Sequence, residues 1–206
     1  MEVKLLLNGS YIARSNSYGV VSSGAAVVVD CGKYDLALQN FLDNNADKSR
    51  LILLTHAHFD HILGAEKLRE KTGVPIAIGK TEAMRMCDPE YNLSARLRNQ
   101  IHKFEPDYLI SDEQTVTVGD LKIKAYEVPG HTKGSMIYLI GDNLFSGDTL
   151  FKNSIGRTDL PSGNSDDMRT SLDRIMWLFD DKVKVFPGHD ETTTIGDERR
   201  ENPYLR

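Results

Sequence analysis

The segment LILLTHAHFDH, at positions 51–61, limits the possible folds of this chain more than any other segment. Four aliphatic residues lead through a threonine into three histidines and an aspartate. A continuous apolar run of strand length is typical of a β-strand that is buried on both faces. We therefore predict a rigid central strand that presents a polar cluster where it ends.

Three further strands are predicted to end in the same way. The segments AYEVPGH and KVFPGH each lead through a Pro-Gly turn to a histidine, His131 and His189, and LFSGD leads to Asp148. In α/β folds, ligands bind beyond the carboxyl ends of the strands, in loops that a rigid sheet holds in place. These side chains are therefore expected to gather with the cluster at 56–61.

The chemistry of this set favours metal ions. Imidazoles and carboxylates bind zinc, iron or manganese, and two histidines at i and i+2 point the same way only from extended backbone. There are more of these side chains than the roughly four ligands that one zinc ion binds, whereas two ions can share them. We predict one site from His56, His58 and His131, and another from Asp60, His61 and His189. Between the two ions we predict a bridging carboxylate, Asp148. His102 lies apart and is expected to be solvated.

The rest of the pattern predicts a single domain over residues 1–206. Strands are expected at VKLLL, YIARSNS, AAVVVD, VPIAIG and VKVFPG, with a turn at Asn8-Gly9. Hairpins are expected around Gly119-Asp120 and Gly141-Asp142. Helices are expected over 35–45, 61–73 and 165–179, with Gly73 ending the second and Ser165 capping the third.

The segment 80–110 is the least regular part of the sequence. Its leucines and isoleucine at 93, 97 and 101 recur at helical spacing. The spacing favours a surface helix packed on the core, because a narrow apolar stripe is typical of such helices. The alternative is that this segment forms an edge of a substrate cleft.

Composition excludes several classes of protein. The net charge of −5 and the pI of about 5.7 argue against a nucleic-acid partner, because such proteins present a basic face. No apolar stretch approaches the roughly 20 residues of a membrane span. Cys31 and Cys87 form no disulfide framework, so both are expected to be packing residues in a reducing compartment. The apolar run near the start is too short for a secretion signal, and a cytoplasmic location is expected.

Four motifs resemble those of the metallo-β-lactamase superfamily: THAHFDH, PGHT at 129–132, FSGDTLF at 145–151 and PGH at 187–189. The stretches SIGRTDLP at 154–161 and TTIGDERRENPYL at 193–205 are similar to those of short glyoxalase II-like hydrolases. The resemblance implies an α/β fold, the four-layer αββα sandwich, with metal ions at one edge. It also implies the ligand roles given above for all seven positions.

The sequence differs from some members of this superfamily, and these differences exclude two of their properties from the expected function. Secreted zinc β-lactamases of the best-known type carry cysteine in place of Asp148, so antibiotic hydrolysis is not expected. Glyoxalase II enzymes append a helical domain that binds glutathione, whereas seventeen residues follow His189 here. Tight recognition of glutathione is therefore not expected.

The predicted function is dinuclear metal-dependent hydrolysis of a small-molecule thioester such as S-D-lactoylglutathione. A hydroxide bridging two divalent ions is expected to attack the carbonyl, with Asp60 and Asp148 as the catalytic carboxylates. Zinc is the expected metal, with iron or manganese as alternatives. The rival functions are a mononuclear iron persulfide dioxygenase, a non-catalytic metal-binding protein and a nuclease.

Four residues next to the predicted ligands have two interpretations each. Asp30 and Thr55 either orient the ligands or make ordinary loop hydrogen bonds. Arg157 and Asp159 either border the cleft or form a structural ion pair, and the structural pair is favoured.

Overall fold

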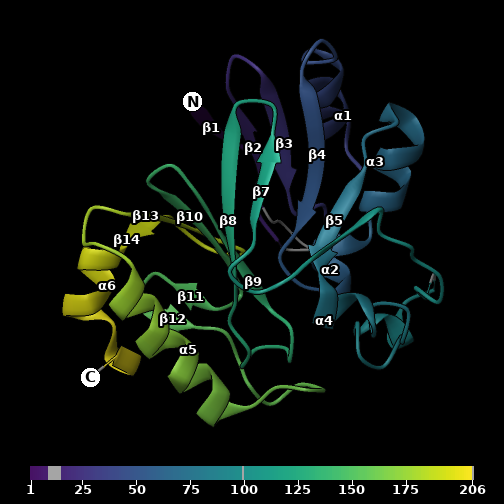
Figure 1. The fold of residues 1–206 in the computed structure, drawn as a ribbon. Helices are drawn as coiled ribbons and strands as arrows, with labels where there is room; N and C mark the ends of the chain where they lie inside the picture. Colours follow the sequence, from purple (N-terminus) through teal and green to yellow (C-terminus); the bar gives the residue numbers. More distant parts are fainter. Residues whose placement is uncertain (9–14, 99, 206) are drawn as a thin grey trace.

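The computed structural model describes residues 1–8, 15–98 and 100–205, and most of their strands lie in two large sheets (Figure 1). The first sheet contains, in spatial order, β1 (Glu2–Leu7), β2 (Ser17–Val21), β3 (Ala25–Val29), β4 (Ser49–Leu54), β5 (Ile76–Gly79) and β6 (Tyr108–Ile110). The second contains β14 (Thr193–Thr194), β13 (Lys184–Pro187), β10 (Asn143–Gly147), β9 (Met136–Ile140), β8 (Leu121–Glu127) and β7 (Thr115–Val118). A small ribbon pairs β11 (Leu150–Phe151) with β12 (Ser154–Ile155).

Helices cover the outer faces of both sheets, as Figure 1 shows. The α-helices are α1 (Leu36–Asp43), α2 (Phe59–Ile62), α3 (Ala65–Thr72), α4 (Lys80–Ala83), α5 (Ser165–Leu178) and α6 (Ile195–Glu201). Two short 3₁₀ helices are η1 (Ser94–Arg96) and η2 (Pro203–Leu205). In the part of the chain that the structure describes, no helix is long and apolar enough to cross a membrane.

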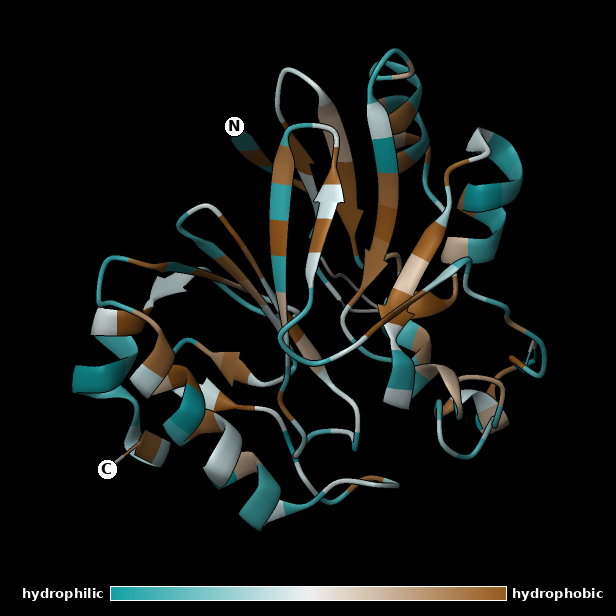
Figure 2. Cartoon of the chain, in the orientation of Figure 1, coloured by the Kyte–Doolittle hydropathy of each residue, from teal (hydrophilic) through white to brown (hydrophobic). Residues whose placement is uncertain are grey.

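Three apolar layers hold these elements together. One packs α1 and α3 against the first sheet, the next lies between the two sheets, and the last packs α5 and α6 against the second sheet. Alternation in β3 explains the division, since Val28 faces the helices while Val27 and Val29 face the other sheet. In Figure 2 the same alternation appears as brown and teal bands along β8, whose Ile123 is buried between exposed neighbours. The predicted αββα sandwich is confirmed.

The predicted central strand is β4. It lies between β3 and β5 and is parallel to both, and Ile52, Leu53 and Leu54 are fully buried. In the second sheet β10 and β13 are also parallel, so both end at the same edge. Both Gly-Asp hairpins are confirmed as the β7–β8 and β9–β10 turns.

The helix predicted over 61–73 is divided into α2 and α3. The division falls at Leu63 and Gly64, where the backbone passes close to the loop after β3. Gly64 donates its N–H to the Cys31 carbonyl at 2.9 Å, and a Cβ at Gly64 would lie 2.1 Å from Tyr34 N. This tertiary contact separates the two helices, whereas Gly73 ends α3 in the left-handed conformation as predicted.

The segment 80–110 contains no long surface helix among its described residues, so that prediction is wrong. Only α4 and the single turn of η1 are helical before β6 begins. Ile101 and Phe104 enter the core beside Met86, while Leu93, with a φ of 63°, points into a cavity described below. Ile101 and Phe104 therefore pack against core residues that are distant in sequence, and this packing replaces the predicted surface helix.

Two smaller predictions also change. Helix α5 is capped by Asn164, whose side chain accepts hydrogen bonds from Asp166 N and Asp167 N, and Ser165 is its first residue. Residues 11–14 of the predicted strand YIARSNS lie outside the described residues, and of its described residues, 15–17, only Ser17 belongs to β2. The predicted Asn8-Gly9 turn lies partly outside the described residues.

Candidate metal centre

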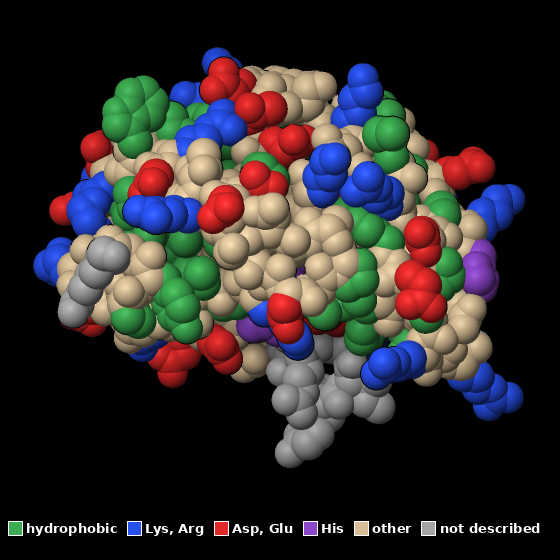
Figure 3. Space-filling model, turned by 90° about the horizontal axis from the view of Figure 1, so that it is seen from below, with side chains coloured by type: hydrophobic (Ala, Val, Ile, Leu, Met, Phe, Trp, Pro, Cys, Tyr) green, Lys and Arg blue, Asp and Glu red, His purple; other side chains and the backbone are tan. Residues whose placement is uncertain are grey.

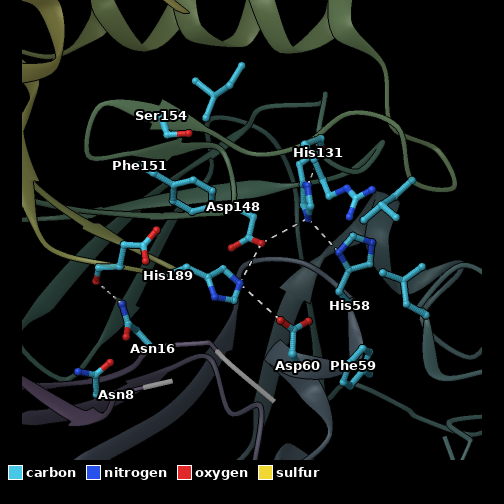
Figure 4. Close-up of a pocket in the computed structure, with 15 residues that line it drawn as sticks. Asn8, Asn16, His58, Phe59, Asp60, His131, Asp148, Phe151, Ser154 and His189 are labelled. Carbon is cyan, nitrogen blue, oxygen red and sulfur yellow. Dashed lines mark hydrogen bonds and ion pairs between the residues drawn. The ribbon is translucent and has the colours of Figure 1, made fainter. Parts of the chain in front are cut away.

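The candidate ligands lie where strands of both sheets end (Figure 4). Strand β4 leads to His56 and His58, and the following turn forms α2, which carries Asp60 and His61. Strands β10 and β13 lead to Asp148 and His189, and β8 leads through a Pro-Gly turn to His131. Because the parallel strands end together, the fold brings all seven predicted side chains to one edge.

The first group consists of His56, His58 and His131. Its ligand atoms lie within 4.8 Å of one another. Nδ1 of His58 is 3.2 Å from Nε2 of His56 and 2.9 Å from Nε2 of His131. Nitrogens around a tetrahedral zinc ion, at bond lengths near 2.0–2.1 Å, are separated by about 3.3 Å. The spacing of the three nitrogens therefore suits a single ion.

The second group consists of Asp60, His61 and His189, whose ligand atoms also lie within 4.8 Å of one another. Oδ2 of Asp60 lies 3.4 Å from Nε2 of His189 and 3.9 Å from Nε2 of His61. These distances leave space for a second ion among one carboxylate and two imidazoles.

Asp148 contacts both groups. Its Oδ1 lies 3.3 Å from Nε2 of His61, and its Oδ2 lies 3.2 Å from Nε2 of His189 and 3.5 Å from Nε2 of His131. A carboxylate in this place can serve two ions at once. Gly188 permits this approach, since a Cβ there would lie 2.2 Å from Oδ1 of Asp148.

Unsatisfied buried atoms show that the site fits a cation. His61 Nε2 and Asp148 Oδ1 are both buried and lie 3.3 Å apart, and neither makes a hydrogen bond to any described residue. Buried polar atoms without partners destabilise a fold, and such atoms in native proteins are rare. A metal ion beside these two atoms would satisfy both.

Hydrogen bonds on the far side of the rings orient the imidazoles. His61 Nδ1 donates to Asp30 Oδ2 at 2.8 Å, and His131 Nδ1 donates to the Arg157 carbonyl at 2.8 Å. Asp30 also accepts from the N–H and the hydroxyl of Thr55, each at 2.8 Å. Asp30 therefore orients a candidate ligand and also makes loop hydrogen bonds, to the loop after β4, so both interpretations of this residue hold.

The two groups differ in their affinity for protons. Burial, reinforced by neighbouring His131, lowers the pKa of His58 to about 3, and burial likewise holds the pKa of His56 well below its usual value. Burial also opposes charging of His189, but hydrogen bonds to Asp148 and Asp60 raise its pKa to about 10. At neutral pH His56 and His58 are therefore neutral, whereas His189 holds a proton.

This difference predicts a pH-dependent affinity for one ion. Metal ions bind the deprotonated imidazole, so an ion entering the second group must displace the proton of His189 below its pKa of about 10. We expect the affinity for that ion to rise as the pH increases from about 7 towards 10. The affinity for the first ion should change little, because His58 is neutral above a pKa of about 3.

Calorimetric titration of the metal-free protein with zinc, in buffers of different ionisation enthalpy, measures these protons. One binding step should release at least one proton near pH 7, and the other should release almost none. Equal proton release in both steps would contradict the assignment.

A cavity of about 640 Å³ opens onto the cluster. Candidate ligands from both groups face it, namely His58, His131, Asp60, Asp148 and His189. Its apolar lining comes from Phe59, Leu93, Phe151, Ile155 and Leu160. The volume falls in the range typical of small-molecule sites.

The structure also shows where the other residues named in the sequence analysis lie. Arg157 lines the cavity and forms two 2.7 Å hydrogen bonds with Asp159, so the pair is structural and also borders the cleft. His102 is exposed, as predicted. Cys31 is buried, and Cys87 is partly buried and bonds to the backbone of Phe104.

Sequence reasoning missed two polar residues close to the site. Asn16 lines the cavity and donates to the carbonyls of Pro187 and Asp190, which holds the loop around His189. Glu82 is fully buried and bonds to loops of the first group. The sequence around Glu82 gives no local indication of this role, since the residue follows Lys80 and Thr81 after the apolar VPIAIG strand.

Comparison with known proteins agrees with this geometry. A model of the metallo-beta-lactamase superfamily matches residues 12–189. The probable metallo-hydrolase YqgX of Bacillus subtilis (strain 168) is 31% identical over 195 residues, which cover 93% of this chain and 92% of that protein. BLEG-1, described as a B3 metallo-beta-lactamase, is 34% identical with a TM-score of 0.88 and 99% coverage of both chains.

TTHA1623, solved in a di-iron-bound form, is 29% identical with a TM-score of 0.78, and the match covers 96% of this chain and 98% of that one. This chain belongs to the metallo-beta-lactamase superfamily. It carries a His/Asp metal-binding cluster at the edge where its two sheets meet.

Proposed function

We propose that this protein is a dinuclear metal-dependent hydrolase that cleaves small-molecule thioesters, with S-D-lactoylglutathione as a representative substrate. The observation that carries the proposal is the place of Asp148, within 3.3 Å of His61 and 3.5 Å of His131. A carboxylate between two complete ligand groups supports two ions per chain rather than one. The likeness to a protein named a probable metallo-hydrolase supports hydrolysis.

Zinc is the proposed metal, since imidazole and carboxylate ligands suit it well. Iron is the alternative, because a similar protein is known in a di-iron-bound form. When bound, the ions would supply a hydroxide nucleophile at neutral pH and positive charge for the developing oxyanion.

The chain's own residues prepare the site for this chemistry. Asp30 and the Arg157 carbonyl hold the rings of His61 and His131 with their Nε2 atoms towards the cluster. Asp60, which is partly exposed to the cavity, lies 3.4 Å from His189 Nε2 and can accept a proton during attack. The apolar side chains of the cavity wall offer a surface against which the acyl group would lie.

The lining of the cavity supports a small substrate with little net charge. Among the described residues that line it, Arg157 is the one arginine and there is no lysine, and Asp159 already pairs with its guanidinium. On the face shown in Figure 3, basic and acidic side chains are interspersed. Together with the net charge of −5, this distribution supports a small-molecule substrate rather than a nucleic acid.

The proposal is tested by metal analysis of protein made without added metal, combined with a substrate panel. The panel contains lactoylglutathione, a simple acyl thioester, an oxygen ester and a β-lactam, since BLEG-1 is described as a B3 metallo-beta-lactamase. We expect about two ions per chain and the fastest cleavage for thioesters. The KM for lactoylglutathione should exceed about 1 mM, the upper end of common values, because we expect binding to depend mainly on the acyl group near the metals.

Metal-free protein in the same assays is the control for ion-independent cleavage. One ion per active chain would contradict the dinuclear site. Faster cleavage of the β-lactam than of any thioester would contradict the substrate class.

A further inference from the structure

Glu82 is a buried carboxylate that neither metal group uses. It lies in α4, directly after β5, and its side chain is fully buried. No ion pair with lysine, arginine or histidine accompanies it within the described residues. A buried carboxylate is costly unless hydrogen bonds satisfy both oxygens, so its partners indicate why it is there.

Four donors from three separate segments satisfy Glu82. Oε2 accepts from Ala57 N at 2.8 Å. Oε1 accepts from the Tyr91 hydroxyl and the Thr132 hydroxyl, each at 2.7 Å, and from Gly134 N at 3.0 Å. One side chain therefore joins the loop after β4, the segment before η1 and the loop before β9.

Two of these donors are adjacent in sequence to ligands of the first group. Ala57 lies between His56 and His58, and Thr132 directly follows His131. The three histidines come from loops of two different sheets, yet their nitrogens must keep the spacing of 2.9–3.2 Å described above. We infer that Glu82 is a positioning residue, which fixes these two loops against each other and sets the geometry of the first metal group.

The second group has no such link to Glu82. The partner that orients His61 is Asp30, while Asn16 donates to the loop that contains His189. A change at Glu82 should therefore weaken one ion selectively. This inference rests on the proposed dinuclear site, and its test separates the two.

The isosteric change Glu82→Gln tests the need for a carboxylate. An amide offers one acceptor oxygen and one NH₂ donor, whereas both oxygens of Glu82 accept a backbone N–H. In either orientation of the amide, the N–H of Ala57 or of Gly134 faces a donor. The loops keep a direct backbone bond, Met136 N to the Thr55 carbonyl at 2.9 Å, which supports folding of the variant.

The matched control is Glu198→Gln. Glu198 is also buried, and it accepts from Asn153 N, the Asn202 side chain and the Thr193 hydroxyl. None of these partners is adjacent in sequence to a candidate ligand. The control therefore measures the loss of a buried carboxylate in a part of the fold that does not hold the first group.

The measurement is competition for zinc between each metal-free protein and a chromophoric chelator. In Glu82→Gln we expect affinity for one ion to fall about 10–100-fold, the usual effect of losing a partner outside the ligands, with the other ion within about threefold. In Glu198→Gln both affinities should stay within about threefold of the parent. Equal effects of the two variants on both ions would overturn the inference.

Two further results keep the test decisive. If Glu82→Gln fails to fold by circular dichroism, Thr132→Val removes one donor of the linked loops more gently, and unchanged affinity for both ions in that variant would overturn the inference. The parent titration counts the ions independently. If the parent protein binds only one ion, the dinuclear function is refuted. The ratio of the zinc affinity of the variant to that of the parent still tests the role of Glu82.

Discussion

Asp148→Ala is expected to abolish thioester hydrolysis, with a loss on the order of 10³-fold or more, and to weaken both metal ions. The reason is geometric, because its two oxygens contact His61 on one side and His131 and His189 on the other. Removing the carboxylate leaves these imidazoles without the shared anion between them. Elemental analysis after gel filtration and the thioester assay measure the two effects.

Asp190→Asn is the matched control for this prediction. Asp190 lines the same cavity and carries the same formal charge, but it belongs to none of the candidate metal groups. Its φ of 62° suits asparagine as well as aspartate, so the change introduces little strain. If Asp148→Ala retained its metal and its activity, the shared site would be wrong.

His61→Ala is expected to abolish hydrolysis and leave one ion bound, which separates the hydrolase from the iron persulfide dioxygenase. The dioxygenase needs only two histidines and one carboxylate, which His56, His131 and Asp148 would supply. The hydrolase also needs the second group, in which His61 is buried and held by Asp30.

The measurement pairs metal analysis with two assays of the parent and the variant, thioester cleavage and oxygen uptake with glutathione persulfide after iron loading. His102→Ala controls for loss of a histidine, since His102 is exposed and outside the cluster. Iron loading alone decides nothing, because a similar protein holds two irons. Rapid oxygen consumption that survives His61→Ala would favour the mononuclear iron enzyme.

Local sequence patterns were sufficient to predict most of the strands, helices and turns of the fold. The apolar run before His56 predicted β4, because a strand buried on both faces needs apolar side chains throughout. Helix α1 followed from its spacing, with Leu38, Phe41 and Leu42 buried. The turns at Gly119 and Gly141 followed from the left-handed conformation that glycine adopts easily, with φ of 54° and 61°.

Predictions failed where distant residues override local preference. The turn at Gly64 follows from close packing on the loop after β3, which no pattern within 61–73 indicates. Between 80 and 110, Ile101 and Phe104 leave helical spacing to fill the core beside α3. Hydrophobic burial gives more free energy than a marginal surface helix, so tertiary packing decides the backbone there.

The sequence by itself determined the chemical types of the cluster, because the side chains that follow each strand are a local property. The family and the αββα layers followed from the resemblance of these motifs to those of the metallo-β-lactamase superfamily. Only the tertiary structure decided which atoms meet, including the contact of Asp148 with both groups and the placement of Asp30 behind His61. Glu82 is the clearest case, because its partners at 57 and 91 are distant in sequence and its partner at 132 comes from the second sheet, so they meet only in the folded chain.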